Sequence, residues 1–337
     1  MSSIIQMISS KHFQVEQLAN GVYAVIHRAG GLAVANACIV NLGNQALVFD
    51  TLLTPQAAID LNLAAEALTD QTVTLVVNSH YHSDHTWGNQ AFAPDADLIS
   101  SEGTRRMLIS NAIDDYRWYK ENLGDHYPGS SMGATVWTAQ PRVEIDAVLE
   151  KSFTQGIQEA LPRLRFRHPN LTFEKSLTLH GSDRTVQLIS FNGGHTLSDA
   201  VLWIPDERIL AAGDLLYTGA HPYQLEADPR QTINVLDQIA ALEPKFIVPG
   251  HGPVGTSRDL LIMQGYLTAM ISKAEELARR EQPLAAARRA KIPAAYQVWQ
   301  LGSNYTASLR RMVLQVAREN GLELVTPTQD VLDHIVI

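Results

Sequence analysis

Four side chains that can bind metal ions lie close together at the end of an apolar stretch. They are His80, His82, Asp84 and His85. In an extended backbone, side chains two positions apart point to the same side, so His80 and His82 can share one cation. If the chain then turns, Asp84 and His85 can face a second cation beside the first. Imidazole and carboxylate ligands suit Zn²⁺ and neighbouring divalent metals, so this spacing predicts a metal centre.

Three further candidate ligands each follow a glycine at the end of an apolar stretch. They are His195 in FNGGHT, Asp214 in ILAAGDLLY and His251 in IVPGHGP. Glycine lets a backbone turn sharply and approach a metal closely, and sites in layered α/β folds gather at the carboxyl ends of strands. Each residue alone fits a structural role equally well. Together they supply the ligands that the first four residues lack for two metal sites.

The stretches that lead to these residues predict strands, because they are short, rich in β-branched residues and bounded by turn-forming residues. The predicted strands are 22–27, 35–41, 46–50, 72–78, 185–191, 200–204, 208–213 and 245–250. Helices are predicted from Pro55 to about Leu68 and from Pro229 to Ala240, each with a capping residue before the proline. Strands that alternate with helices in both halves of the chain indicate a layered α/β domain.

Two regions fall outside this pattern. The first is a long insert at about 102–169. Its aromatic side chains are expected to form either a small core of the insert itself or an apolar contact for a substrate. Its aromatic residues are Tyr116, Trp118, Tyr119, Tyr127 and Trp137. Beyond Gly255 the chain is predicted to be helical, since Thr256 can cap a helix whose apolar residues recur from Leu260 to Leu277 at steps of three and four. That apolar face packs on the core or on a partner such as a second copy of the chain. Either region could cover a substrate pocket.

Composition narrows the functional classes. The 337 residues include 45% hydrophobic and 18% charged residues, as in ordinary globular proteins. A net charge of −9 argues against nucleic acid as a partner and is compatible with a small-molecule substrate. The single cysteine, Cys38, excludes an intramolecular disulfide and predicts a small buried side chain. No stretch resembles a secretory signal or is long enough to cross a membrane, so we predict a cytoplasmic protein without a membrane partner.

The seven candidate ligands, in their order along the chain, resemble those of the metallo-β-lactamase superfamily over roughly residues 20–255. The resemblance implies an α/β fold, the αββα sandwich, with a metal centre at one edge between the two sheets. Residues 256–337 would form a helical C-terminal region packed on this catalytic domain. The implied cofactors are two divalent metal ions, most readily Zn²⁺, with Mn²⁺ or Fe²⁺ also compatible with such ligands.

The resemblance also implies a role for each ligand. One metal would be bound by His80, His82 and His195, and the second by Asp84, His85 and His251, while Asp214 would bridge both. Asp50, in LVFDT, matches the aspartate that orients a ligand imidazole through a hydrogen bond.

Asp214 narrows the reaction that the resemblance implies. Zinc β-lactamases usually have cysteine or serine at this position, whereas a bridging aspartate is typical of glyoxalase II-like thioesterases, lactonases and phosphodiesterases. The run from Trp203 to Tyr223 also resembles SoxH-like hydrolases. We therefore expect a metal-dependent hydrolase in which a hydroxide shared by two metals attacks a small-molecule ester, lactone, thioester or amide. Asp84 would orient this nucleophile and carry its proton. Tyr217 and His221 follow Asp214 closely enough to contact a substrate, although ordinary surface residues would have the same spacing.

Other functions stay open at this point. An iron-dependent persulfide dioxygenase-like oxidoreductase needs only part of the ligand set, and the complete second set counts against it. A β-lactamase or a phosphodiesterase of the same superfamily is a further alternative. A scaffold without activity is disfavoured, because clustered histidines and buried carboxylates are costly without a metal. A homodimer through the stripe from Leu260 to Leu277 is also compatible with the sequence.

Overall fold

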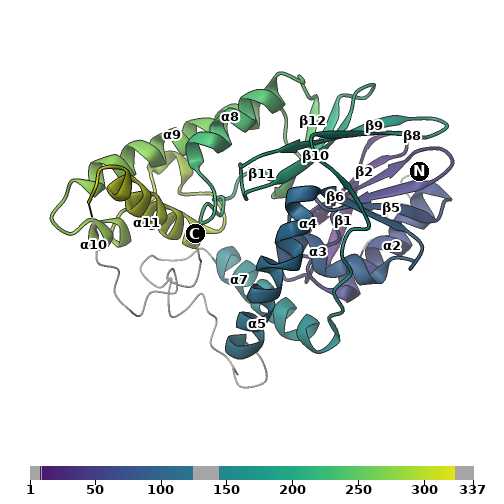
Figure 1. Cartoon of the computed structure of the whole chain (residues 1–337), viewed down its shortest axis with the longest axis horizontal. Helices are drawn as coiled ribbons and strands as arrows, with labels where there is room; N and C mark the ends of the chain where they lie inside the picture. Colours follow the sequence, from purple (N-terminus) through teal and green to yellow (C-terminus); the bar gives the residue numbers. More distant parts are fainter. Residues whose placement is uncertain (1–7, 9, 124–143, 323–337) are drawn as a thin grey trace.

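Two β-sheets that lie face to face form the centre of the molecule (Figure 1). The computed structural model describes residues 8, 10–123 and 144–322. The first sheet contains, in spatial order, β1 (Phe13–Ala19), β2 (Val22–His27), β3 (Ala37–Asn41), β4 (Ala46–Phe49), β5 (Val73–Val77), β6 (Asp97–Ser101) and β7 (Leu171–Phe173). The second contains β12 (Phe246–His251), β11 (Ile209–Tyr217), β10 (Asp199–Ile204), β9 (Thr185–Phe191) and β8 (Ser176–His180).

Alternate side chains of one strand face different apolar layers. In β2, Val22 and Ala24 belong to the layer between the two sheets, to which β9–β12 also contribute. Tyr23 and Val25 belong to a second layer, beneath helix α2 (Pro55–Thr69). This alternation follows from the period of two along a strand, and it leaves the central strands β2, β3 and β4 of the first sheet buried on both faces.

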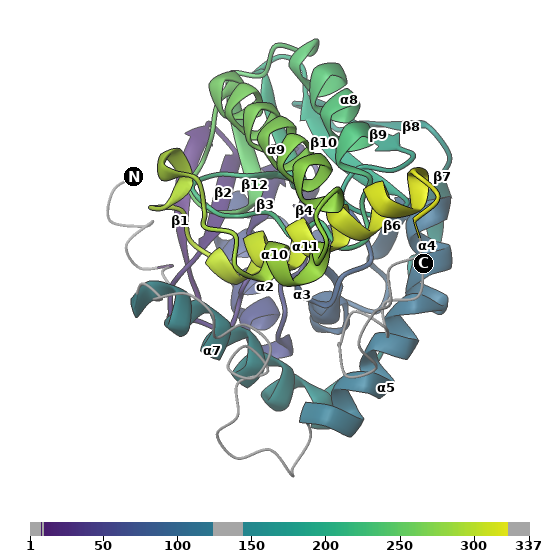
Figure 2. The ribbon, with the colours of Figure 1, turned by 90° about the vertical axis from the view of Figure 1, so that its left-hand side faces the viewer.

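Helices α8 (Pro229–Ala240) and α9 (Ser257–Ala278) cover the outer face of the second sheet (Figure 1). Helices α10 (Pro283–Arg288) and α11 (Gly302–Glu319) follow and pack beside α9 (Figure 2). With α2 outside the first sheet, the layers are helix, sheet, sheet and helix. The predicted αββα fold and the helical C-terminal region are therefore confirmed as far as residue 322; residues 323–337 lie outside the described part.

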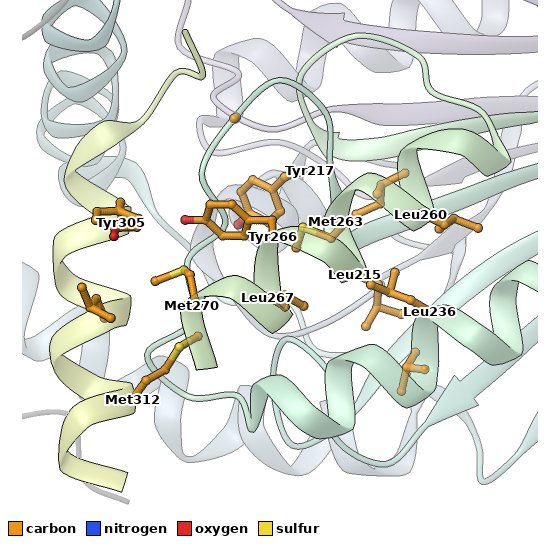
Figure 3. Close-up of a cluster of buried hydrophobic side chains, with 14 of the residues drawn as sticks. Leu215, Tyr217, Leu236, Leu260, Met263, Tyr266, Leu267, Met270, Tyr305 and Met312 are labelled. Carbon is orange, nitrogen blue, oxygen red and sulfur yellow. The ribbon is translucent and has the colours of Figure 1, made fainter. Parts of the chain in front are cut away.

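The apolar face of α9 is buried within this chain. Helix α9 begins after Thr256, whose side chain forms the predicted cap together with Asp259. Tyr266 and Leu267 share an apolar cluster with Leu215 of β11 and with residues of α8 and α11 (Figure 3). Because the chain's own strands and helices cover this face, it is not available for a homodimer, which corrects that expectation for the Leu260 to Leu277 stripe.

The insert forms helices α4 (Glu102–Ile109), α5 (Asn111–Leu123) and α7 (Glu144–Ala160), followed by the short turn η2 (Leu161–Arg163). Tyr116, Trp118 and Tyr119 of α5 pack with Trp87 and with Phe153 of α7. These three aromatic side chains therefore contribute to a small core that the insert shares with Leu53 and Trp87 of the neighbouring fold. Tyr127 and Trp137 lie outside the described residues.

Several strands differ from the sequence-based expectation. Strand β1 begins at Phe13, before the expected domain start at residue 20, and β6, β7 and β8 were not predicted. Strand β11 extends to Tyr217, so Asp214 lies inside a strand and not in the turn after it. Cys38 is buried between the sheets, as predicted. Among the described helices, none combines the length and apolar character needed to cross a membrane.

Candidate metal centre

Three imidazoles and a carboxylate meet in a group that we call the first cluster: His80, His82, His195 and Asp214. His80 and His82 follow the end of β5, and His195 lies in the turn between β9 and β10. The Nδ1 atom of His82 lies 3.1 Å from His80 Nε2 and 3.0 Å from His195 Nε2. A tetrahedral zinc ion with ligands at 2.0–2.1 Å places neighbouring ligand atoms about 3.3 Å apart. The nitrogens are therefore spaced as ligands of one cation.

Asp84, His85 and His251 form a second cluster beside the first. Asp84 and His85 lie in the single helical turn α3 (Ser83–Thr86), and His251 is the last residue of β12. The Oδ2 atom of Asp84 lies 3.5 Å from His251 Nε2 and 3.9 Å from His85 Nε2. The turn that the sequence predicted after His82 is thus present, and it separates the two clusters.

Asp214 faces both clusters with different oxygen atoms. Its Oδ2 lies 3.3 Å from His195 Nε2, whereas its Oδ1 lies 3.0 Å from His85 Nε2 and 3.4 Å from His251 Nε2. Gly250 makes this approach possible, because a Cβ atom there would lie 1.9 Å from Asp214 Oδ1. All seven residues singled out in the sequence therefore meet at one place, with Asp214 between the two groups.

Unpaired buried atoms indicate that this site fits cations. Within the described part of the chain, His85 Nε2 and Asp214 Oδ1 are buried and have no hydrogen-bond partner of regular geometry, although they lie 3.0 Å from each other. Buried polar atoms without partners are costly and rare in folded proteins. A divalent cation between these atoms would satisfy both, and it matches the chemistry of the nitrogen and oxygen donors.

The electrostatics of the first cluster favour the neutral form of His80 and His195 but not of His82, where the Glu226 carboxylate outweighs burial and raises the pKa to about 9. Burial lowers the pKa of His80 well below its usual value, and neighbouring imidazoles add to this effect. Burial also lowers the pKa of His195 to about 4. Burial would raise the pKa of Asp214, but the imidazoles of His251, His85 and His195 outweigh it and hold that pKa well below its usual value. Neutral histidines and an ionised carboxylate are the forms that coordinate a cation.

Asp50 orients ligands of both clusters. It accepts hydrogen bonds from the backbone N–H of Ser79, from Ser79 Oγ and from His85 Nδ1, each at 2.8 Å. Because Ser79 Oγ donates to Asp50, it accepts from His80 Nδ1 at 2.9 Å. The Nε2 lone pairs of His80 and His85 are therefore turned toward the clusters. Asp50 has a φ of 64°, a left-handed conformation that aspartate tolerates better than most residues.

Glu226 contacts the first cluster in a way that the sequence did not reveal. It lies between β11 and α8, and its Oε1 accepts hydrogen bonds from His82 Nε2 at 3.0 Å and from Tyr81 Oη at 2.7 Å. Because His82 donates through Nε2, its Nδ1 lone pair faces the first cluster. Asp199 similarly accepts the backbone N–H of His195 at 3.0 Å. Neither carboxylate stands in a local pattern that marks a metal site.

The two expected substrate contacts have different surroundings. Tyr217 lies at the site: its hydroxyl donates to Asp214 Oδ2, and its ring stacks on His251 with centroids 4.8 Å apart. His221 is fully buried, and its Nδ1 lies 2.9 Å from the hydroxyl of Tyr266 on α9. A side chain without exposed surface in this aromatic contact cannot line an open pocket, which corrects the expectation for His221.

Comparison with known families agrees with this geometry. The model of the metallo-β-lactamase superfamily matches residues 30–251, about two thirds of the chain. This chain belongs to the metallo-β-lactamase superfamily. A curated relative, the metallo-β-lactamase type 2 of Bacteroides fragilis, is 32% identical over 92 residues. That match covers 26% of this chain and 37% of the relative, so it spans little more than a third of the relative's length.

Solved structures support the same fold. TMB-1 has a TM-score of 0.55 at 18% identity, and the match covers 77% of this chain and 99% of TMB-1. The DIM-1 metallo-β-lactamase has a TM-score of 0.52 at 17% identity, with 77% and 99% covered. A metallo-β-lactamase from Pontibacter korlensis has a TM-score of 0.51 at 18% identity, with 76% and 99% covered. At these identities the similarity establishes the fold alone.

Proposed function

We propose that this chain is a dinuclear-metal hydrolase that cleaves a small-molecule ester, lactone, thioester or amide. The observation that carries the proposal is the placement of Asp214, whose two oxygens face different groups of imidazoles. A carboxylate shared in this way suits two adjacent cations, and Zn²⁺ fits the donor set best. The proposed ligands are His80, His82, His195, Asp84, His85, His251 and the bridging Asp214.

The chain's own residues supply orientation and proton transfer. When bound, two divalent cations lower the pKa of water and polarise the carbonyl or phosphoryl group under attack. The side chains of Asp84 and His82 keep 12% and 15% of their surface exposed, so this side of the site is the open one. Asp84 can accept a proton from the attacking water and return it to the leaving group. Tyr217 holds Asp214 through its hydroxyl, and we keep it as a proposed substrate contact.

Asp214 also bears on the substrate class. An aspartate at this position favours the glyoxalase II-like and SoxH-like branch over the zinc β-lactamases, which usually have cysteine or serine there. A β-lactamase is the second candidate, because the Bacteroides fragilis relative and two of the similar structures carry that name.

Metal analysis combined with a substrate panel tests the proposal. Zinc-loaded protein is assayed with a lactone, a thioester, a β-lactam and a phosphodiester, in parallel with His85→Ala. We expect the wild-type protein to bind two metals per chain. In His85→Ala one metal should be lost and hydrolysis should fall more than about 100-fold. This effect is larger than that of losing a hydrogen bond to a metal ligand. The control is His180→Ala, at an exposed histidine of β8.

Two results would contradict this function. One is a single iron per chain with oxygen uptake on glutathione persulfide, which would indicate a dioxygenase. The other is undiminished hydrolysis by His85→Ala. A panel in which only the β-lactam is hydrolysed would favour the second candidate.

A further inference from the structure

Asn36 is bonded to the backbone on both sides of His251. Its backbone N–H donates to Gly250 O at 2.8 Å, and its side-chain amide donates to Pro249 O at 2.9 Å and to Gly252 O at 2.8 Å. Asn36 is almost completely buried and stands immediately before β3 of the first sheet, whereas His251 ends β12 of the second. These three hydrogen bonds therefore tie the turn around His251 to the opposite sheet.

The orientation of the Asn36 amide follows from its partners. Its Oδ1 accepts the backbone N–H of His27 at 2.9 Å, and a backbone N–H can only donate. The oxygen therefore faces His27, and both amide protons face the carbonyls around His251. His27 Nδ1 lies 2.9 Å from the same oxygen and must carry a proton. A buried amide whose donors and acceptor are all paired resists rotation.

The turn around His251 needs such external support. Glycine stands on both sides of His251, and Gly252 adopts a φ of +91° that other residues rarely adopt. A Cβ atom at Gly252 would lie 1.9 Å from the backbone oxygen of Thr218, so no larger residue fits there. Glycine gives the backbone wide conformational freedom. The position of the His251 imidazole is therefore set by contacts from outside the turn.

We infer that Asn36 is a positioning residue for the second cluster, because it holds the turn that presents His251 to Asp84 and Asp214. The inference rests on the proposed metal centre. His251 Nε2 lies 3.5 Å from Asp84 Oδ2 and 3.4 Å from Asp214 Oδ1, and a displaced turn would lengthen both distances. The ligands of the first cluster are carried by other segments, so the loss of Asn36 affects the second site selectively.

Metal titration of Asn36→Asp in the full chain tests this role. Aspartate keeps the size and the acceptor of asparagine but has no amide protons for the two carbonyls. Stripped protein is titrated with Zn²⁺ against a chromophoric chelator and with Co²⁺ followed by absorption. We expect the second-site affinity to fall about 10- to 100-fold, the range typical of residues that orient metal ligands. The first-site affinity and its Co²⁺ spectrum should stay as in the wild type.

The matched control is Asn41→Asp. Asn41 ends β3, and its amide donates to Thr69 O at the end of α2, away from the His251 turn. This variant loses a similar hydrogen bond to a backbone carbonyl at the far end of β3 from Asn36, and both metal affinities should be retained. If Asn36→Asp does not fold, Asn36→Ala removes the same amide without adding a buried charge, and the same selective loss is expected.

Three outcomes separate this inference from the proposed function. Wild-type affinity for the second metal in the Asn36 variants overturns the inference. Equal losses at both sites also overturn it, because they indicate general destabilisation. Wild-type protein that binds fewer than two metals contradicts the proposed dinuclear centre itself, whatever the variants do.

Discussion

The two clusters share the support of Asp50, but their other supports come from different parts of the molecule. The second cluster is held from within the sandwich, because Asp50 after β4 bonds to His85 and Asn36 before β3 bonds to the turn of His251. Both supporting residues belong to segments of the first sheet that are buried on both faces. Their positions therefore depend on the central strands of the fold.

The first cluster depends in part on a loop. His82 is oriented by Glu226, which lies between β11 and α8. Helix α11 in turn holds this loop. Gln224 N donates to Ser308 Oγ at 3.1 Å, and Arg311 Nε donates to Leu225 O at 3.0 Å.

This difference links the C-terminal helices to the metal centre. The superfamily match ends at residue 251, so α11 lies beyond it, yet α11 holds the segment that carries Glu226. Ligands supported by strands are positioned more rigidly than ligands supported by loops. We therefore expect the first cluster to respond to changes in the C-terminal region and the second cluster to respond to changes in the first sheet.

Asp214 is the proposed ligand that both clusters share, so removing its carboxylate should weaken metal binding at both clusters. In Asp214→Asn, one oxygen and the negative charge that faces both groups are lost. We expect the affinity for both metals to fall more than about 100-fold, beyond the usual effect of a residue that only orients a ligand. Competition with a chromophoric chelator measures both affinities. Asp237→Asn on the exposed face of α8 is the control, and loss of a single metal in Asp214→Asn would mean that the carboxylate is not shared.

A sharper test of the comparison is Glu226→Gln, which keeps the shape of the side chain but removes its charge. The hydrogen bond to His82 Nε2 weakens, and the imidazole is less firmly oriented. We expect the first-site affinity to fall about 10- to 100-fold, with the second site nearly unchanged. The measurement is the same two-site titration.

The control for this change is Glu243→Gln. Glu243 forms an exposed ion pair with Arg208, and such surface pairs contribute about 0–1 kcal/mol. A loss of affinity in Glu226→Gln that is larger at the second site would contradict the division of support between the two clusters.

The ligands were predictable because each stands in a local pattern. A buried strand followed by a turn, with histidine or aspartate at its end, marks His80, His195 and His251 from the sequence alone. Asn36 and Glu226 have no such signal. Asn36 bonds to a residue 213 positions away, and Glu226 bonds to one 145 positions away. Their roles arise only when the two sheets and the loop come together.

The missed strands and the correction at His221 have similar causes. The edge strands β1 and β8 are at most partly buried, so their sequences, FQVEQLA and SLTLH, lack the continuous apolar run that marks the central strands. His221 is only seven positions from Asp214, but β11 continues to Tyr217 before the chain turns. The backbone of His221 then bonds to Gln300 and its ring lies against Tyr266. Nearness in sequence was therefore a poor guide to nearness to the metals.

The smallest expected effect concerns the link between α11 and the loop of Glu226. Ser308 accepts from Gln224 N at 3.1 Å and donates to Pro222 O at 3.3 Å, and Ser308→Ala removes both bonds. We expect the free energy of unfolding to fall by about 1 kcal/mol for each lost bond. A displaced loop should lower the first-site affinity by at most about tenfold, which corresponds to roughly 1.4 kcal/mol.

The second site should keep its affinity in Ser308→Ala, because its supports lie in the first sheet. Denaturant unfolding and the two-site titration measure the two effects separately. Ser110→Ala is the matched control, since Ser110 is exposed and its hydroxyl bonds within the turn that ends α4. Equal weakening of both sites would contradict a selective link between α11 and His82. It would show that α11 acts through overall stability, or through Thr218 of the same loop, whose backbone N–H donates to His251 O at 3.1 Å.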